Sequence, residues 1–235
     1  LVSRASHKRN SEADIDPADG AFVELRYPYQ QLTAREQKLY RALYSGISAY
    51  EEIITLPGTY TADEYERVYL MVRMQEPAFF YVENVYELAE AQYEVRMHYS
   101  MTQGEAEQLG AALEARADNI VSRLSPTQTD WQKLLMIHDA IGSGCMYGAD
   151  THSDDAYGCL CEGTAQCEGY AKAFLYVARR AGLEVMCVPG QSASGGNHVW
   201  NIAAIDGAYY NIDLTWDDDN TYCGETVHNC FAVAD

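Results

Sequence analysis

Three polar residues in the second half of the chain could together form a nucleophilic centre: Cys167, His198 and Asp213. A thiol can act as nucleophile, an imidazole can remove its proton, and a carboxylate can hold the imidazole in one orientation and tautomer. The carboxylate also stabilises the imidazolium that forms when the thiol loses its proton. The three residue types therefore predict acyl transfer through a thioester.

Cys167 comes directly before an apolar pattern typical of a buried helical face. Apolar residues recur with helical spacing from Ala171 to Ala178, and Arg179 and Arg180 are typical of the last turn of a helix. We therefore expect Cys167 in the first turn of a helix, where the peptide dipoles favour the thiolate form. For Cys167 taken alone, the alternative is a small apolar residue that fills a core.

His198 begins the first strand of a predicted hairpin. The apolar runs 198–205 and 208–216 are separated only by Asp206 and Gly207, and Asp-Gly between such runs is the strongest short-range hairpin signal. A two-residue turn makes Ile205 face Ala208. Counting outward from that pair fixes the register of both strands.

In that register, Trp200 faces Asp213 and His198 faces Thr215. Directly opposed residues and alternate residues along a strand project from the same face of a sheet. His198 and Asp213 are then diagonal neighbours on one face, roughly 7 to 8 Å apart. The hairpin thus predicts that the imidazole and the carboxylate meet.

Three motifs around these residues, "QCEGYAKAF", "NHVWNI" and "YYNIDLTWDD", resemble the core motifs of the transglutaminase-like superfamily, in the family's order. The resemblance covers roughly residues 128–230. It implies Cys167 as nucleophile, His198 as base and Asp213 as the residue that orients the base. It also implies an α+β fold with a papain-like core, in which a helix packs on an antiparallel sheet.

Other residues could support such a site. The Cys167 backbone amide could donate to the oxyanion that forms on an attacked carbonyl, and Gln166 and Tyr147 are candidates for a second donor. Trp200 and Trp216 are interpreted first as aromatic residues of the core or of a cleft wall, with substrate contact as a secondary role.

The first half of the chain carries helix signals and no chemical motif. Capping boxes, in which a threonine and a glutamate satisfy each other's free amides, predict three helix starts: Thr33 with Glu36, Thr61 with Glu64, and Thr102 with Glu105. We expect the first helix to continue through Ile54 and the third through Leu124. Segments 77–82 and 93–101 are expected to be extended, and a fourth helix is expected over 130–141.

These patterns predict three regions. Residues 1–20 lack aromatic residues and periodicity and are expected to be a disordered leader or linker. Residues 21–125 form a mainly helical N-terminal region, and residues 126–235 form the core with the candidate site.

Charge and hydropathy restrict the partners. Sixteen basic and thirty-five acidic residues give a net charge of −19, which repels nucleic acid and anionic lipid. No apolar run approaches the roughly 20 residues of a membrane span. An extracellular or cell-envelope location is expected from the acidic, tyrosine-rich composition, with the cytoplasm as the alternative.

Seven cysteines are too few for a disulfide scaffold. Cys223 could pair with Cys230, and Cys145 with Cys159 or Cys161. A zinc site built from Cys145, His152, Cys159 and Cys161 is the alternative, although the spacing fits no common zinc pattern. The acidic loop 217–220 could offer oxygen ligands to calcium but is more typical of a solvated loop. We expect no metal and no organic cofactor.

The sequence thus predicts a transglutaminase-like cysteine acyltransferase or peptidase that acts on the carboxamide or peptide bonds of a protein or peptide. A primary amine as acceptor would give crosslinking or modification, and water would give deamidation or proteolysis. The rival hypothesis is a catalytically silent binding or scaffold module with the same fold.

Overall fold

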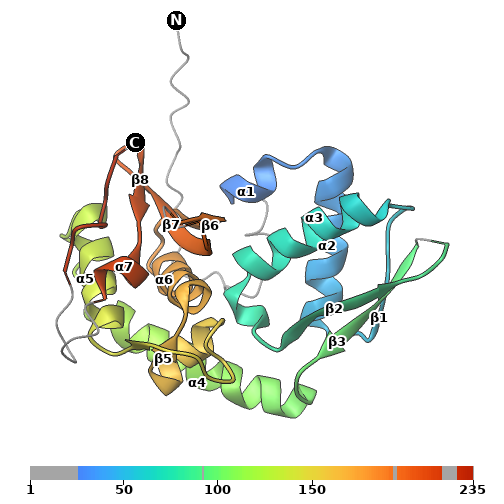
Figure 1. Cartoon of the computed structure of the whole chain (residues 1–235), viewed down its shortest axis with the longest axis horizontal. Coiled ribbons are helices and arrows are strands. Elements are labelled where there is room, and N and C mark those ends of the chain that lie inside the picture. Colours follow the sequence, from blue (N-terminus) through green and yellow to red (C-terminus); the bar gives the residue numbers. More distant parts are fainter. Residues whose placement is uncertain (1–25, 92, 193–194, 219–226, 235) are drawn as a thin grey trace, which may run out of the picture.

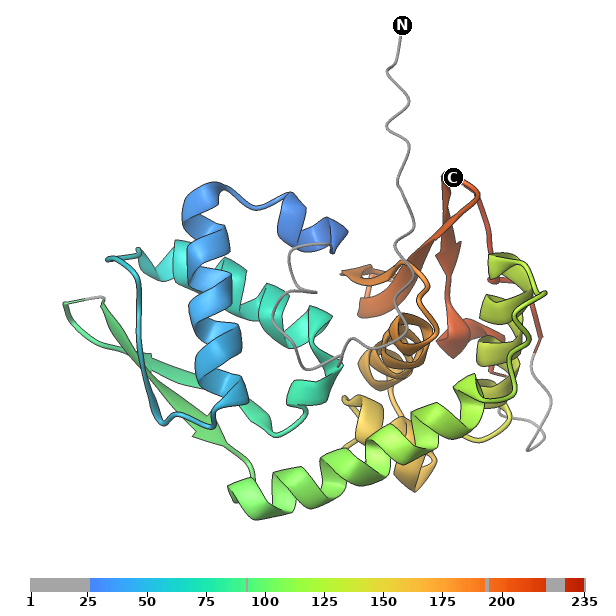
Figure 2. The same cartoon turned by 180° about the vertical axis from the view of Figure 1, so that it is seen from behind.

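The computed structural model describes residues 26–91, 93–192, 195–218 and 227–234. The leader expected at 1–20 lies outside these ranges, as do Cys223 of the expected Cys223–Cys230 pairing and residues 219 and 220 of the acidic loop. The described residues form two lobes, and helix α4 begins beneath the first lobe and continues along the second (Figures 1 and 2).

The first lobe consists of helices around a three-stranded antiparallel sheet with the strand order β1-β3-β2. Its elements are α1 (Tyr27–Gln30), α2 (Ala34–Ser48), β1 (Ile53–Thr55), α3 (Ala62–Gln75), a 3-10 helix (Pro77–Phe79), β2 (Val82–Leu88) and β3 (Glu94–Tyr99).

The second lobe holds the other three-stranded antiparallel sheet, with the order β6-β7-β8, and a short parallel pair, β4 with β5. Its elements are α4 (Gln103–Val121), α5 (Asp130–Gly142), β4 (Met146–Tyr147), a π-helix (Gly158–Glu162), β5 (Thr164–Ala165), α6 (Cys167–Arg180), β6 (Val185–Gln191), β7 (Asn197–Ile205), β8 (Ala208–Ile212) and α7 (Leu214–Asp217).

The three predicted capping boxes are present at the starts of α2, α3 and α4. A fourth box, in which Thr129 pairs with Gln132, starts α5. Glutamine can replace glutamate in this motif, so the signal for α5 was present in the sequence. Local side-chain to backbone bonds therefore set where four long helices begin.

Two predictions for the first lobe are wrong. The first helix ends at Ser48 rather than continuing through Ile54, because Tyr50 takes a left-handed backbone with φ of 58°. Ile54 is buried from strand β1, which pairs with β3. Segment 77–82 begins as a 3-10 helix at Pro77, and only Val82 enters a strand.

The core of the second lobe lies between α6 and the sheet. Tyr170 and Phe174 of α6 are fully buried, and the Asn201 side chain on β7 donates to the Ala171 carbonyl of α6 at 3.0 Å. Leu113 of α4 is buried in the same hydrophobic cluster, so this core extends upstream of residue 126. A helix packed on an antiparallel sheet confirms the predicted α+β class.

The predicted hairpin is present with the predicted turn. Ile205 pairs with Ala208, and the register continues to Asn201 opposite Ile212. Strand β8 then ends, contrary to the expectation that it continues to residue 216. The Asp213 amide donates to the Cys230 carbonyl at 3.0 Å, and the next four residues form α7. Thr215 is therefore helical and does not face His198 across a ladder.

None of the helices in the described ranges has the length and apolar character needed to span a bilayer.

Candidate active site

Cys167 is the first residue of α6, as the sequence predicts, and it is partly exposed. The chain enters this helix through a tight bend, in which the Gln166 amide donates to the Ser153 carbonyl at 2.7 Å. A Cβ added at Gly169 would lie 2.2 Å from the same Ser153 carbonyl oxygen. Glycine therefore lets the loop lie directly against the first turn of α6, next to Cys167.

His198 and Asp213 meet as the hairpin predicts. The His198 Nε2 atom lies 2.6 Å from Asp213 Oδ2, a distance typical of a strong charge-assisted hydrogen bond. His198 is buried, with 8% of its surface exposed. Burial raises the pKa of Asp213, and the hydrogen bond from His198 acts in the opposite direction. The carboxylate thus has one dominant partner in a mostly enclosed position.

The second oxygen of Asp213 positions α7. Asp213 Oδ1 accepts a hydrogen bond from the Trp216 amide at 3.3 Å, so Asp213 is also the N-cap of this short helix. An N-cap carboxylate satisfies one of the free amides at a helix start. The same side chain therefore fixes both the imidazole and the helix that follows it.

Two tryptophans flank the imidazole. The Trp200 ring lies nearly parallel to His198, with a centroid distance of 6.1 Å, and the Trp216 ring lies at 5.8 Å. Trp200 is fixed by a hydrogen bond from its indole nitrogen to Asn211 at 3.0 Å, whereas Trp216 has 54% of its surface exposed. Both sequence candidates therefore lie beside the site, and Trp216 forms its solvent side.

Residues one turn beyond Cys167 tie α6 to both partners. Asn201, three residues after His198, donates to the Ala171 carbonyl, and the Tyr170 hydroxyl donates to Asp218, five residues after Asp213. The structure has no hydrogen bond between Cys167 and His198. It thus joins His198 to Asp213 and docks the helix that carries Cys167 on the strand that carries His198.

Gln166 and Tyr147 both lie at the entry to α6. Gln166 is the N-cap residue, but its side chain makes no capping hydrogen bond. Tyr147 pairs with Ala165 across the β4–β5 ladder and has 47% of its surface exposed. Tyr147 therefore lies opposite Ala165, the residue two positions before Cys167.

The part of the chain that holds the candidate site matches a known protein family. Residues 114–214, which include all three residues of the candidate site, match the family model of the transglutaminase-like superfamily. This segment resembles a transglutaminase core, and we call it the transglutaminase-like core. No curated protein matches the sequence significantly.

Several solved structures resemble the chain at low identity. A TGase shares 11% identity over 69% of this chain and 50% of its own, with a TM-score of 0.41. A candidate cysteine protease from Cytophaga hutchinsonii shares 18% sequence identity over 45% of this chain and 37% of its own, with a TM-score of 0.37. The periplasmic domain of TgpA from Pseudomonas aeruginosa shares 14% sequence identity over 57% of this chain and 63% of its own, with a TM-score of 0.34. This chain spans less than two thirds of the length of each.

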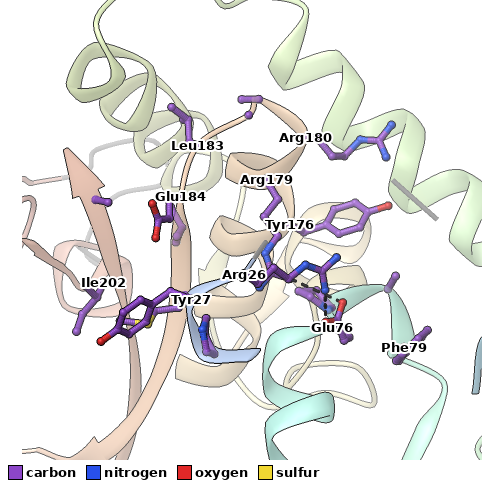
Figure 3. A pocket seen from close by; sticks show the side chains of 18 of the residues that line it. Arg26, Tyr27, Glu76, Phe79, Tyr176, Arg179, Arg180, Leu183, Glu184 and Ile202 are labelled. Atoms are coloured by element: carbon purple, nitrogen blue, oxygen red, sulfur yellow. Dashed lines mark hydrogen bonds and ion pairs between the residues drawn. The ribbon is translucent and has the colours of Figure 1, made fainter. Parts of the chain in front are cut away.

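One pocket in the described part of the chain lies apart from the candidate site. It has a volume of about 1000 Å³ and lies between the first lobe and the transglutaminase-like core. Figure 3 shows the ion pair between Arg26 and Glu76 on its wall, with Tyr176 and Arg179 from α6 nearby. None of Cys167, His198 and Asp213 lines this pocket.

The cysteine alternatives can be compared with the six cysteines that the structure describes. No two of these six are bonded to each other, so Cys145 is paired with neither Cys159 nor Cys161. Cys145 and Cys159 share a hydrogen bond, and burial raises the pKa of Cys159. The zinc alternative is wrong, because His152 instead pairs with Glu162 at 2.9 Å and these residues do not converge on one point.

Sequence reasoning missed a buried polar group behind the site. His138 of α5 and Asp217 of α7 are both fully buried and lie 3.2 Å apart, Nε2 to Oδ2. The spacing of His138 predicted only a core position on a helix. Asp217 belongs to the acidic loop that was interpreted as solvated, and only its burial distinguishes it from its neighbours.

Proposed function

We propose that the transglutaminase-like core catalyses thiol-dependent acyl transfer, with Cys167 as nucleophile, His198 as general base and Asp213 as the residue that orients the base. The observation that carries this proposal is the 2.6 Å hydrogen bond between His198 and Asp213, on elements that pack against the helix beginning at Cys167. The match of residues 114–214 to the superfamily supports it.

The hydrogen bond selects a tautomer of His198. Asp213 is a partly buried acceptor, so the proton of neutral His198 resides on Nε2 and the lone pair on Nδ1. Nδ1 can then accept the thiol proton of Cys167. Hydrogen bonds of this kind are often long without substrate and shorten when it binds. The imidazolium that results lies beside the Asp213 carboxylate, which stabilises it.

The proposed reaction proceeds in two steps. The Cys167 sulfur attacks the carbonyl carbon of a glutamine carboxamide or peptide bond, and a carbon–sulfur bond forms. The carbon–nitrogen bond then breaks, and the leaving amine takes the proton held by His198. A primary amine or water next attacks the thioester, gives its proton to His198, and releases the Cys167 thiol as that proton returns.

The start of α6 supports the negative charge that develops on the attacked oxygen. The Gln166 side chain does not cap this helix, whereas threonine side chains cap α2, α3, α4 and α5. The first amides of α6, including that of Cys167, are therefore not covered by a capping side chain and can donate to an oxyanion. Gln166 and Tyr147 remain our candidates for the second donor.

A binding or scaffold module is the second candidate function. One observation favours it: Cys167 makes no hydrogen bond to His198, although both side chains lie on elements that pack together. A protein that only binds partners would keep the fold and the His198–Asp213 pair without needing the thiol.

The test is mass spectrometry of a glutamine-bearing protein incubated with and without a primary amine. Addition of the amine indicates a transferase, and deamidation or cleavage indicates a hydrolase. The activity must disappear in Cys167→Ala and persist in Cys161→Ser, which removes another partly exposed thiol. Absence of any product, with no change between wild type and Cys167→Ala, would favour the scaffold.

A further inference from the structure

A second cluster of polar side chains lies at the C-terminal half of α5, away from the proposed reaction. His138, Asp139 and His228 each offer one ligand atom, and these atoms lie within 4.8 Å of one another. His138 Nδ1 lies 3.2 Å from Asp139 Oδ1, and His228 Nε2 lies 2.7 Å from the same oxygen. The cluster joins α5 to a segment 89 residues further along the chain.

The contacts of His138 need more protons than a neutral imidazole holds. Its Nε2 faces Asp217 Oδ2 at 3.2 Å and its Nδ1 faces Asp139 Oδ1 at 3.2 Å. Ionised carboxylates only accept hydrogen bonds, and neutral histidine has a single N–H. One of the two contacts therefore brings a lone pair against a carboxylate, unless a cation lies at that contact or the ring is protonated.

The contacts of Asp217 determine which nitrogen of His138 is available to bind a metal ion. Asp217 is fully buried, and its other oxygen accepts a hydrogen bond from the Cys230 amide at 2.8 Å. This carboxylate is therefore held as an acceptor that takes the Nε2–H of His138. Metal-bound histidines usually donate their second nitrogen to a carboxylate in this way, which fixes the tautomer and makes the ligating nitrogen more basic.

We propose that His138 Nδ1, Asp139 and His228 bind a divalent transition metal ion of the zinc class. The 3.2 Å separation between His138 Nδ1 and Asp139 Oδ1 is close to the edge of a tetrahedron with metal–ligand distances of about 2.0 to 2.1 Å, and the 2.7 Å between His228 Nε2 and Asp139 Oδ1 must lengthen when the ion binds. Two neutral imidazoles with the carboxylates of Asp139 and Asp217 balance a charge of +2. Imidazole with carboxylate is a donor set that suits zinc.

The bound ion would stabilise the position of α7 through His138 and Asp217. Asp217 is the last residue of α7, and its amide donates to the Asp213 carbonyl at 3.2 Å. A metal at His138 would thus hold His138 against Asp217, and through α7 it would hold Asp213 in place. The role is structural and goes beyond the proposed acyl transfer, so metal binding can be measured without any activity.

The test is titration of the chelator-treated full chain with Co²⁺, followed by displacement with Zn²⁺. One equivalent of Co²⁺ should give the visible absorption of a tetrahedral site without the charge-transfer band of thiolate ligands. Zn²⁺ at about 100 times its Kd should raise Tm by roughly 5 to 10 °C.

Variants assign the ligands. His228→Gln and Asp139→Asn replace residues that have about half of their side-chain surface exposed, so both should fold, and each should weaken binding by at least about 100-fold. Asp217→Asn should weaken it about 10- to 100-fold. His152→Gln is the matched control, because it removes an equivalent histidine–carboxylate pair outside the cluster, and it should change nothing.

Absence of stoichiometric binding at micromolar Co²⁺ and Zn²⁺ would overturn the proposal. A thiolate charge-transfer band, or unchanged affinity in His228→Gln, would also overturn it, because the metal would then bind elsewhere.

Discussion

Asp213 joins the chemistry to the fold at the scale of a single residue. One of its oxygens accepts from His198 at 2.6 Å and the other from the Trp216 amide at 3.3 Å. The proposed reaction needs the negative charge of this side chain, whereas the cap of α7 needs only an acceptor oxygen. The two roles can therefore be separated by a neutral substitution.

Asp213→Asn should keep the fold and lose most of the activity. Asparagine caps helices about as well as aspartate, so Tm should change little. The uncharged amide cannot stabilise the imidazolium, and it can hold His198 in the wrong tautomer, so kcat/KM should fall about 10²- to 10⁴-fold. Steady-state kinetics and thermal unfolding measure both effects.

Asp206→Asn in the hairpin turn is the control for that substitution. Asp206 has a positive φ of 52°, which asparagine tolerates, and it lies outside the site. It should leave both kinetics and Tm unchanged. A fully active Asp213→Asn protein would remove Asp213 from the mechanism.

At the scale of elements, local signals predicted the positions of the site residues well. The start of α6 and the Asp206–Gly207 turn depend on short stretches of sequence, so both could be identified before the structure. The end of β8 could not, because it depends on the bond between the Asp213 amide and the Cys230 carbonyl. Burial of Asp217 behind the site depends on tertiary packing in the same way.

A substitution at Gly169 tests the close contact between the first turn of α6 and the Ser153 loop. Gly169→Ala would place a Cβ 2.2 Å from the Ser153 carbonyl oxygen, so helix or loop must shift. We expect a loss of about 1 to 3 kcal/mol in the free energy of unfolding, measured by urea denaturation.

Gly110→Ala is the matched control in the middle of α4. Nothing lies within 4 Å of a Cβ at this position, so alanine should stabilise the helix by about 0.5 to 1 kcal/mol. If both variants were stabilised, the close approach of α6 to the Ser153 loop would be wrong.

Asp155, in the loop that leads to the site, should make the stability of the fold depend on pH. Its carboxylate accepts from the Gly158 amide at 3.0 Å, and burial raises its pKa to about 6. Between about pH 4 and 6 the folded protein therefore holds a proton that the unfolded chain has lost, so this contribution to stability is present at low pH and disappears as pH rises.

The stability difference between wild type and Asp155→Asn measures that contribution. Wild type minus variant should fall by on the order of 2 kcal/mol from pH 4 to pH 6.5 and remain constant above. A difference that does not vary with pH would contradict the raised pKa of Asp155.

At the scale of the whole molecule, the buried side chain of Gln75 helps to join the two lobes. Gln75, the last residue of α3, donates to the Cys187 carbonyl at 2.7 Å and accepts from the Cys187 amide at 3.2 Å. Cys187 lies on β6, which is an edge strand of the sheet. A glutamine from the first lobe thus pairs buried backbone groups of the transglutaminase-like core, so the lobes should unfold together.

Gln75→Leu should leave the Cys187 amide and carbonyl buried without these partners. At about 1 to 3 kcal/mol for each unpaired group, we expect a loss of roughly 2 to 4 kcal/mol in the free energy of unfolding. Gln103→Leu on the exposed start of α4 is the control and should change stability by less than about 0.5 kcal/mol. Equal effects of the two substitutions would contradict the proposed role of Gln75.

The covalent intermediate tests the central claim most directly. Wild-type protein mixed with a glutamine-bearing peptide and no amine should form a thioester that peptide mapping locates on Cys167. His198→Ala should form it far more slowly, and Cys167→Ala should not form it. An acyl group found on another residue, or product formed at an unchanged rate by Cys167→Ala, would contradict the assignment of Cys167 as nucleophile.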